Sequence, residues 1–385
     1  MEPGLQPEVK NPAGTASPSV PDPLRQPAIT GHEVYKPDHI EWILIGPHGL
    51  RAGWSVLLFA ASFYLFDLII GTILFSTGLV GETRVDAAAN VLTGALAALL
   101  ALAGTAAWIS LLEGHRIRDY NLADRRLPRH LISGLISGFA AISVLVGSLA
   151  WGGWLRFGAD ELSGAQSVGL AAMWGCVFLL VGLVEEGLFR CYGLFTLWRG
   201  INFWWAISAE AAICVYVFVR GGNGANGVFA AAGLGLVPCL ILHLRGGKKS
   251  CFWQAAWVTS TMFGVYHTYN SGENSVGILA AAAIGFVFCV SVWATGSAWW
   301  AIGFHAAWDW GETYFYGTSD SGMSAQGHYL SAKPAGNPLW SGGSDGPEGS
   351  LLVLGVVVLL ALFLVASHRW NKFGGGEPSS DPAAG

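Results

Sequence analysis

The sequence predicts an all-α fold, a polytopic transmembrane helical bundle of about eight to ten spans. Of its 385 residues, 53% are hydrophobic and only 12% are charged, whereas an average soluble domain carries about 25% charged residues. Several apolar runs reach the roughly 20 residues that a helix needs to cross a bilayer. The 53 glycines and 18 tryptophans agree with this, because small residues allow close helix contacts in lipid and indole rings favour the membrane interface.

Ten apolar runs define the expected helices. They lie at about 54–80, 86–111, 131–154, 170–198, 203–219, 226–244, 253–269, 275–295, 298–316 and 350–367. Lys and Arg residues concentrate in alternate loops, namely Arg116, Arg118, Arg125, Arg126, Arg129, Arg199, Arg245, Lys248, Lys249, Arg369 and Lys372. Because basic loops stay in the cytoplasm, this asymmetry predicts cytoplasmic N- and C-termini. We expect an integral membrane protein.

The polar segments set the expected domain organisation. Residues 1–53 hold nine of the 16 prolines and predict a disordered cytoplasmic tail, because such a composition buries little apolar surface. A transmembrane helical domain is expected over 54–369. Within it, the Gly-, Ser- and Pro-rich stretch 317–349 predicts a polar extramembrane loop on the outer side, a lid or a plain linker. Residues 370–385 predict a flexible C-terminal tail.

Two adjacent acids and an arginine interrupt the run 170–198. Insertion scales place an acid or arginine at a helix centre about 2.5–3.5 kcal/mol uphill, so Glu185, Glu186 and Arg190 need a reason to be there. Glu186 and Arg190 are four residues apart and share a helix face, so they can pair directly, whereas Glu185 lies about 140° from Arg190. Either Glu185 is then free to act as a general base or acid, or both acids share Arg190 in a structural clasp.

Two histidines lie in equally apolar surroundings. Phe263 and His267 share one helix face, so the aromatic ring can fix the orientation of the imidazole. His305 and Asp309 also share a face, and the carboxylate can hold the imidazole in one tautomer. A lone histidine of this kind is usually structural, but two histidines with two acids favour a hydrolytic site.

The three motifs, taken in order, resemble the signatures of the CPBP intramembrane protease family. That family includes the type II CAAX prenyl endopeptidase and bacterial proteins of bacteriocin processing or self-immunity. The resemblance covers about residues 170–316 and implies an intramembrane endopeptidase that acts on a membrane-associated protein or peptide. Together with the polar N-terminal tail, it also implies a bacterial plasma membrane as the location. It implies that Glu185 activates water with His267 as its partner. It further implies that His305 and Asp309 stabilise the oxyanion and that Glu186 and Arg190 support the site.

The sequence departs from the family pattern in two places. The third motif often ends in Asn, whereas Asp309 donates a hydrogen bond only when protonated, so orientation of His305 or metal ligation is an alternative role. About 60 residues separate Arg190 from the helix of His267, which indicates an inserted helical hairpin. No cofactor is certain: Glu185, His267 and His305 could hold a divalent metal such as zinc with an open position for water, or the site could work without an ion.

Other polar residues carry weaker signals. Asp67 and Glu210 are single acids expected to face the bundle interior, and Glu312, near the end of its run, is expected to reach water. His243, beside Arg245, favours contact with anionic lipid heads. Besides the bilayer and a peptide substrate, no nucleic-acid partner is expected. Two rival functions stay open: a non-catalytic immunity or scaffold protein, and a proton-coupled transporter that uses the buried acids and histidines as a relay.

Overall fold

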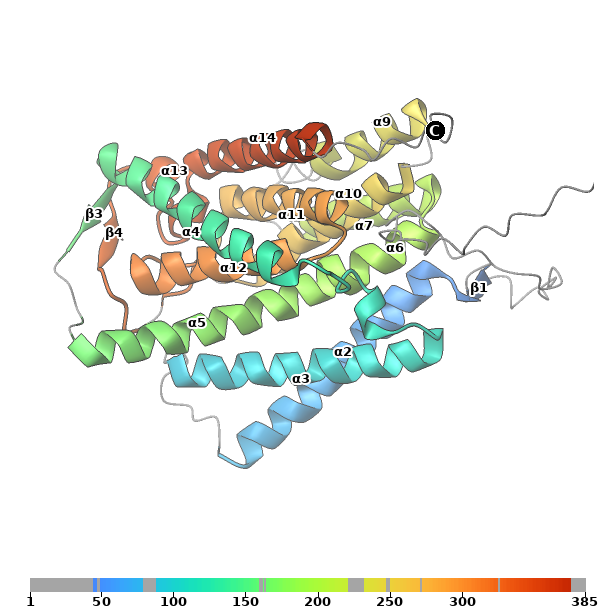
Figure 1. Ribbon diagram of the computed structural model, residues 1–385, viewed down its shortest axis with the longest axis horizontal. Coiled ribbons are helices and arrows are strands. Elements are labelled where there is room, and N and C mark those ends of the chain that lie inside the picture. Colours follow the sequence, from blue (N-terminus) through green and yellow to red (C-terminus); the bar gives the residue numbers. More distant parts are fainter. Residues whose placement is uncertain are drawn as a thin grey trace, which may run out of the picture. The chain divides into compact units, whose positions relative to one another are not determined.

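The computed structural model describes residues 44–46, 49–78, 88–158, 162, 164–220, 232–246, 250–270, 272–324 and 326–374, and helices dominate it (Figure 1). The α-helices are α2 (Ala52–Ser76), α3 (Ala88–Glu113), α4 (Leu127–Trp151), α5 (Gly164–Glu186), α6 (Leu194–Gly200), α7 (Phe203–Arg220), α9 (Val237–Arg245), α10 (Ser250–Tyr266), α11 (Ser275–Thr295), α12 (Trp299–Asp309), α13 (Pro338–Ser341) and α14 (Leu351–Gly374). Between them lie π-helices η2 (Gly187–Gly193), η3 (Ala232–Leu236) and η5 (Trp310–Phe315), and 3-10 turns η1 (Ile117–Asp119), η4 (His267–Tyr269) and η6 (Pro347–Gly349). The short strands are β1 (Ile45–Gly46), β2 (Gly49–Leu50), β3 (Leu155–Phe157) and β4 (Ala332–Pro334).

The predicted all-α membrane-type bundle is confirmed. Five helices of the described chain are long and apolar enough to cross a membrane, namely Ala52–Ser76, Ala88–Glu113, Leu127–Trp151, Gly164–Gly200 and Ser275–Thr295. Shorter apolar helices occupy Phe203–Val219 and Leu351–Ser367. The expected run 298–316 folds as the 11-residue α12 followed by η5. The described chain has fewer long spans than expected apolar runs, because some of the runs form short helices that are buried in the protein.

Helix α12 lies at the centre of the bundle and packs most closely against α4. At Gly134 and Gly138 of α4, an added Cβ would collide with the backbone oxygens of Trp300 and Phe304. Small residues four apart thus let the two backbones touch, which is the usual device for helix association in lipid. The close approach fixes the position of α12, which carries the third motif.

The buried apolar side chains form separate clusters. One joins α4, α11, α12 and α14 and includes Leu145, Leu149, Phe288, Phe304 and Leu360. A second joins α2, α3, α6 and α10 and includes Phe59, Ile109, Leu194 and Val258. The ring centre of Phe288, in the first cluster, lies 6.0 Å from that of His305, so this cluster borders the third motif.

Residues 317–349, which we name the cap, form a folded segment at one end of the bundle. Strand β4 of the cap pairs antiparallel with β3, which follows α4 (Figure 1). Asn274 caps the N-terminus of α11 by accepting hydrogen bonds from the backbone of Val276 and Gly277, and its amide donates to the carbonyl oxygens of Gly342 and Gly349. This double role ties the cap to α11. The extramembrane position expected for 317–349 stays a prediction.

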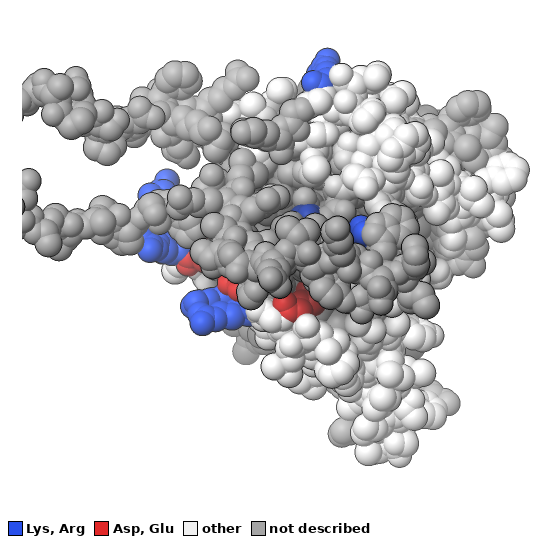
Figure 2. All heavy atoms as spheres, turned by 90° about the vertical axis from the view of Figure 1, so that its right-hand side faces the viewer, with Lys and Arg blue, Asp and Glu red and all other residues white. Residues whose placement is uncertain are grey.

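The opposite end of the bundle carries the arginines between α3 and α4, and we name it the arginine end. Arg199 at the end of α6 lies 2.7 Å from Nε2 of His115, just after α3, which brings α3 and α6 together there. Figure 2 looks onto this side, where blue Lys and Arg atoms gather near red Asp and Glu atoms. Placement of this end in the cytoplasm stays a prediction. Most of the expected tail 1–53, together with 375–385, lies outside the described residues, and 370–374 continue α14.

Candidate active site

The first motif lies where α5 changes into the π-helix η2. Glu185 and Glu186 end α5, and Arg190 lies inside η2. Nη1 of Arg190 is 3.2 Å from Oε1 of Glu186, and both side chains are 0% exposed. The pairing expected from their four-residue spacing is therefore confirmed. Single π-helical turns inside α-helices are frequent at functional sites.

Arg190 is also held by aromatic rings. Its guanidinium carbon lies 4.2 Å from the ring centre of Phe263 and 5.2 Å from that of Phe288. A Cβ added at Gly285 of α11 would meet Nη2 of Arg190. Cation–π contacts in a desolvated place stabilise by about 2 kcal/mol. They offset part of the burial cost of Nε and Nη2, which have no hydrogen-bond partner.

His305 of α12 is surrounded by three carboxylates. Its Nδ1 lies 2.9 Å from Oε1 of Glu186, and its Nε2 lies 3.7 Å from Oε2 of Glu185 and 3.4 Å from Oδ2 of Asp309. The contact with Asp309 agrees with the expected spacing, and the contact with Glu186 links the first motif to the third. Gly182 of α5 allows it, because a Cβ there would lie 3.1 Å from the Ile302 carbonyl oxygen.

His267 lies beside this group but does not pair with a carboxylate in the described part of the chain. It begins η4, directly after α10, and its Nδ1 lies 2.9 Å from the carbonyl oxygen of Phe263. Because that oxygen can only accept, Nδ1 carries the proton and Nε2 is the acceptor. The Phe263 ring centre is 4.6 Å from that of His267 and 6.1 Å from that of His305. All three motifs thus reach one level of the bundle.

The residues that could hold a metal do not converge. Among described residues, Glu185, His267 and His305 do not bring ligand atoms within 4.8 Å of one another. Both ring nitrogens of His305 already face carboxylates, and Nδ1 of His267 is taken by a backbone oxygen. A catalytic zinc needs about three converging protein ligands with an open fourth position. As arranged, Glu185, His267 and His305 do not fit a catalytic zinc ion.

Sequence reasoning missed several features of the site. The contact of Phe263 with Arg190 and the glycines at 182 and 285 carried no signal beyond residue type. The expectation that Glu312 reaches water is wrong, because its side chain is 0% exposed. The only hint of its burial is a spacing of three residues from Asp309, which places both on one side of the helix end.

The remaining singled-out residues lie apart from the motif group. Glu210 is 0% exposed, as expected of an acid facing the interior, and accepts a hydrogen bond of 2.8 Å from Thr261. The His243 ring stacks on Phe203 at 3.9 Å. Lys248 and Lys249 lie outside the described residues, so the lipid contact of this cluster stays a prediction.

Comparison with known protein families agrees with the motifs. Residues 239–311 match the family described as "Type II CAAX prenyl endopeptidase Rce1-like". The match contains His267, His305 and Asp309, while Glu185, Glu186 and Arg190 precede it. No curated protein and no solved structure matches the chain. The part of the chain that carries the second and third motifs is thus similar to the Rce1-like type II CAAX prenyl endopeptidases.

Proposed function

We propose that the protein hydrolyses a peptide bond in a membrane-associated protein or peptide, with Glu185 as the base that activates water. The observation that carries the proposal is the convergence of five motif side chains on one buried place, with His305 between Glu185, Glu186 and Asp309. A polar cluster inside an apolar bundle is costly and is usually functional.

The two adjacent glutamates differ in ways that support different roles. Glu186 is 0% exposed and already paired with both Arg190 and His305. Glu185 is 19% exposed as a side chain, and its buried Oε2 has no hydrogen-bond partner among the described residues. A general base must reach water and have an oxygen free to take the proton. Partial exposure and an uncommitted carboxylate favour Glu185 over Glu186 as the base, and Glu186 serves as the positioning residue for His305.

The reaction follows from these roles. Glu185 takes a proton from water while the water oxygen attacks the carbonyl carbon of the substrate. An N–H of His305 stabilises the negative oxygen of the tetrahedral intermediate, and Nε2 of His267, an acceptor, orients the attacking water. The C–N bond then breaks, and the proton held by Glu185 passes to the leaving amine. Arg190 offsets the charge of Glu186, so His305 keeps its place through the cycle.

The substrate class is proposed from the family. The Rce1-like description names a prenyl endopeptidase, so a prenylated CAAX peptide is the first substrate to test. An apolar prenyl chain would partition into the bilayer and bring the scissile bond to a site enclosed by helices. The partners are then the lipid bilayer and a membrane-associated peptide.

Cleavage of a fluorescence-quenched, farnesylated CAAX peptide by the purified protein in detergent tests the proposal. Glu185→Gln keeps the size of the side chain and removes the base, so cleavage should fall by about 10²–10⁴-fold. Glu210→Gln is the matched control, because it neutralises another buried acid outside the motif group and keeps the oxygen that accepts from Thr261. Full activity of a folded Glu185→Gln protein would overturn the assignment of the base.

A further inference from the structure

A second group of acids lies beneath the cap and has no part in the proposed reaction. Carboxylate oxygens of Glu312, Asp320 and Glu348 all lie within 4.8 Å of one another. Glu312 comes from η5, directly after α12, whereas Asp320 and Glu348 come from opposite ends of the cap. The cap is therefore closed over this end of α12 by segments that meet at three acids.

Neighbouring groups hold two of these acids in place. Glu348 accepts a hydrogen bond of 2.6 Å from the indole N–H of Trp308 and another of 2.8 Å from the hydroxyl of Ser321. Asp320 accepts 3.0 Å from the hydroxyl of Thr313. These bonds orient the carboxylates but do not offset their charge. Among the described residues, no Lys, Arg or His forms an ion pair with the three acids.

The carboxylate of Glu312 has no hydrogen-bond partner in the described part of the chain. Its side chain is 0% exposed, and neither Oε1 nor Oε2 has a hydrogen-bond partner. Asp345 is also 0% exposed, and its Oδ1 is likewise without a partner. Leaving a charged oxygen buried and unpaired costs several kcal/mol. Something of opposite charge must therefore satisfy these oxygens.

We propose that Glu312, Asp320 and Glu348 form a binding site for a divalent cation of the calcium class, which joins the cap to the end of α12. All of the donors are oxygens, which are the ligands that hard cations prefer. Two ligands at about 2.3–2.6 Å from one calcium ion lie at most about 5 Å apart, which agrees with the observed spacing. Separate protons would be needed to neutralise the three carboxylates, whereas one cation at the centre contacts all of them.

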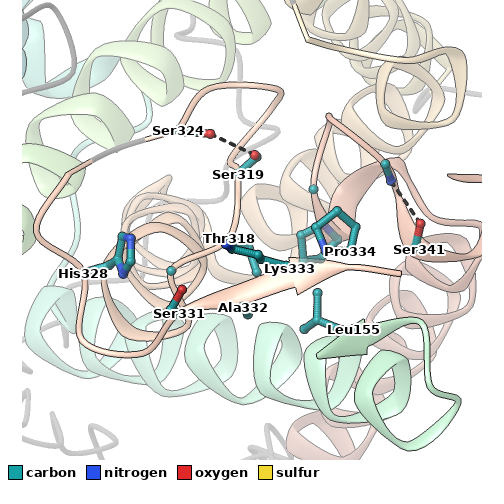
Figure 3. Close-up of a pocket in the computed structure, with 14 residues that line it drawn as sticks. Leu155, Thr318, Ser319, Ser324, His328, Ser331, Ala332, Lys333, Pro334 and Ser341 are labelled. Carbon is teal, nitrogen blue, oxygen red and sulfur yellow. Dashed lines mark hydrogen bonds between the residues drawn. The ribbon is translucent and has the colours of Figure 1, made fainter. Parts of the chain in front are cut away.

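A polar cavity of about 300 Å³ lies next to this site (Figure 3). Its lining includes Thr318, Ser319 and Gly346 of the cap, together with Leu155 of β3. Gly346 separates the cavity from the acids, since a Cβ built on it would lie 3.3 Å from Oε1 of Glu312. The missing side chain lets Gly346, which lines the cavity, lie directly against the acid.

Terbium luminescence tests the site directly. Tb³⁺ binds to calcium sites, and the indole of Trp308 donates a hydrogen bond to Glu348, one of the proposed ligands. Excitation of tryptophan should therefore sensitise the luminescence of the bound ion. In an uncharged detergent, wild type should give a Tb³⁺ signal that Ca²⁺ displaces. Glu312→Gln should weaken Tb³⁺ binding by at least about tenfold, because one charged ligand is lost. Asp119→Asn, an acid at the arginine end whose oxygen accepts from the Arg116 backbone, should bind as wild type does.

A second measurement guards against misfolding of the variant. Thermal unfolding of wild type, followed with Ca²⁺ or with EGTA, should show a higher Tm in Ca²⁺, and Mg²⁺ should have a smaller effect. Tb³⁺ binding that is equal in wild type and Glu312→Gln would overturn the proposal. So would a wild-type Tm that rises with falling pH and does not respond to Ca²⁺, since protons would then hold the cluster. Neither readout uses peptidase activity, so failure here is distinct from failure of the proposed reaction.

Discussion

Two groups of buried or partly buried acids each include one acid of the segment formed by α12 and η5, and the groups differ in how their charge is balanced. In the motif group, Glu185, Glu186 and Asp309 face Arg190 and His305. In the cap group, Glu312, Asp320 and Glu348 face one another, with neutral donors only. The first group contains its own counter-charges. The second needs a partner that the described part of the chain does not supply.

The two groups share a scaffold, which makes the comparison informative. His305, Asp309 and Glu312 follow each other at spacings of four and three residues, so they lie along one side of α12 and η5. A change that shifts this segment should disturb both groups, whereas a change in one counter-charge should disturb one group only.

The largest change in the free energy of unfolding is expected when Arg190, the counter-charge of the motif group, is removed. Arg190→Met leaves Glu186 buried without its cation, and breaking a buried ion pair from one side costs about 3–5 kcal/mol. Denaturant unfolding of the purified protein in detergent micelles would measure the loss. The double variant Glu186→Gln with Arg190→Met should recover much of it, because no unpaired charge remains.

The outcome would also test the roles of the pair. A single Arg190→Met variant as stable as wild type would mean that Glu186 is not charged, and Arg190 would then not be its counter-ion. Tb³⁺ binding at the cap should stay unchanged in a folded variant, since Arg190 does not contact the cap group.

A smaller effect is expected from crowding the guanidinium. Gly285→Ala would place a methyl group against Nη2 of Arg190, and overpacking of a filled interior costs about 1–3 kcal/mol. Gly169→Ala is the matched control, because this helical glycine of α5 has no atom within 4 Å of an added Cβ. That change should be neutral or slightly stabilising, since Ala favours helix by about 1 kcal/mol over Gly. Equal stability of the two variants would show that Arg190 has room to move.

Loss of one neutral donor from the cap group should matter less. Ser321→Ala removes the hydroxyl that donates to Glu348, and one hydrogen bond contributes about 1 kcal/mol. Ser319→Ala is the control within the cap, since among the described residues its hydroxyl forms a hydrogen bond with the exposed Ser324 and none with the three acids. Hydrogen exchange of cap amides should quicken in the first variant and not in the second. Equal exchange would mean that Ser321 does not hold Glu348.

The sequence indicated the motif group but not the cap group, for a physical reason. Charged residues inside apolar runs stand out, and spacings of four residues predict contacts within one helix. The Glu186–Arg190 and His305–Asp309 contacts were therefore accessible. The contact of His305 with Glu186 joins two helices, and spacing within each helix says nothing about it.

The cap acids lacked any such pattern. Asp320 and Glu348 lie in a polar stretch where acids are ordinary, and 28 positions separate them. Their meeting depends on β4 pairing with β3 and on Asn274 holding the far end of the cap. Non-local pairing of this kind has no signal in a single sequence. Burial of Glu312 follows from it and was missed for the same reason.

The smallest expected effect is a difference in the pH response of the two ends of the bundle. At the cap, burial and then the charge of Glu348 raise the pKa of Asp345 to about 7. At the arginine end, burial acts to raise the pKa of Asp124, but hydrogen bonds from Ser297 and His130 outweigh it and lower that pKa. Because its pKa is raised, Asp345 binds more protons in the folded state than in the unfolded state. Its contribution to the free energy of unfolding is therefore lost as the pH rises from about 4 towards 7.

Because the pKa of Asp124 is lowered, its contribution to stability depends on pH in the opposite direction. The contribution of Asp124 to the free energy of unfolding is lost only as the pH falls below its ordinary pKa. With EGTA present, exchange rates corrected for their intrinsic pH dependence should show less protection at the cap at pH 7.5 than at pH 5.5. Amides near Asp124 should hold their protection over that range, since Asp124 stays ionised throughout. Addition of Ca²⁺ should restore protection at the cap, because a cation replaces the protons that the acids lose. Cap protection that instead rises with pH in EGTA would mean that its acids already have a counter-charge, and the contrast between the two groups would fail.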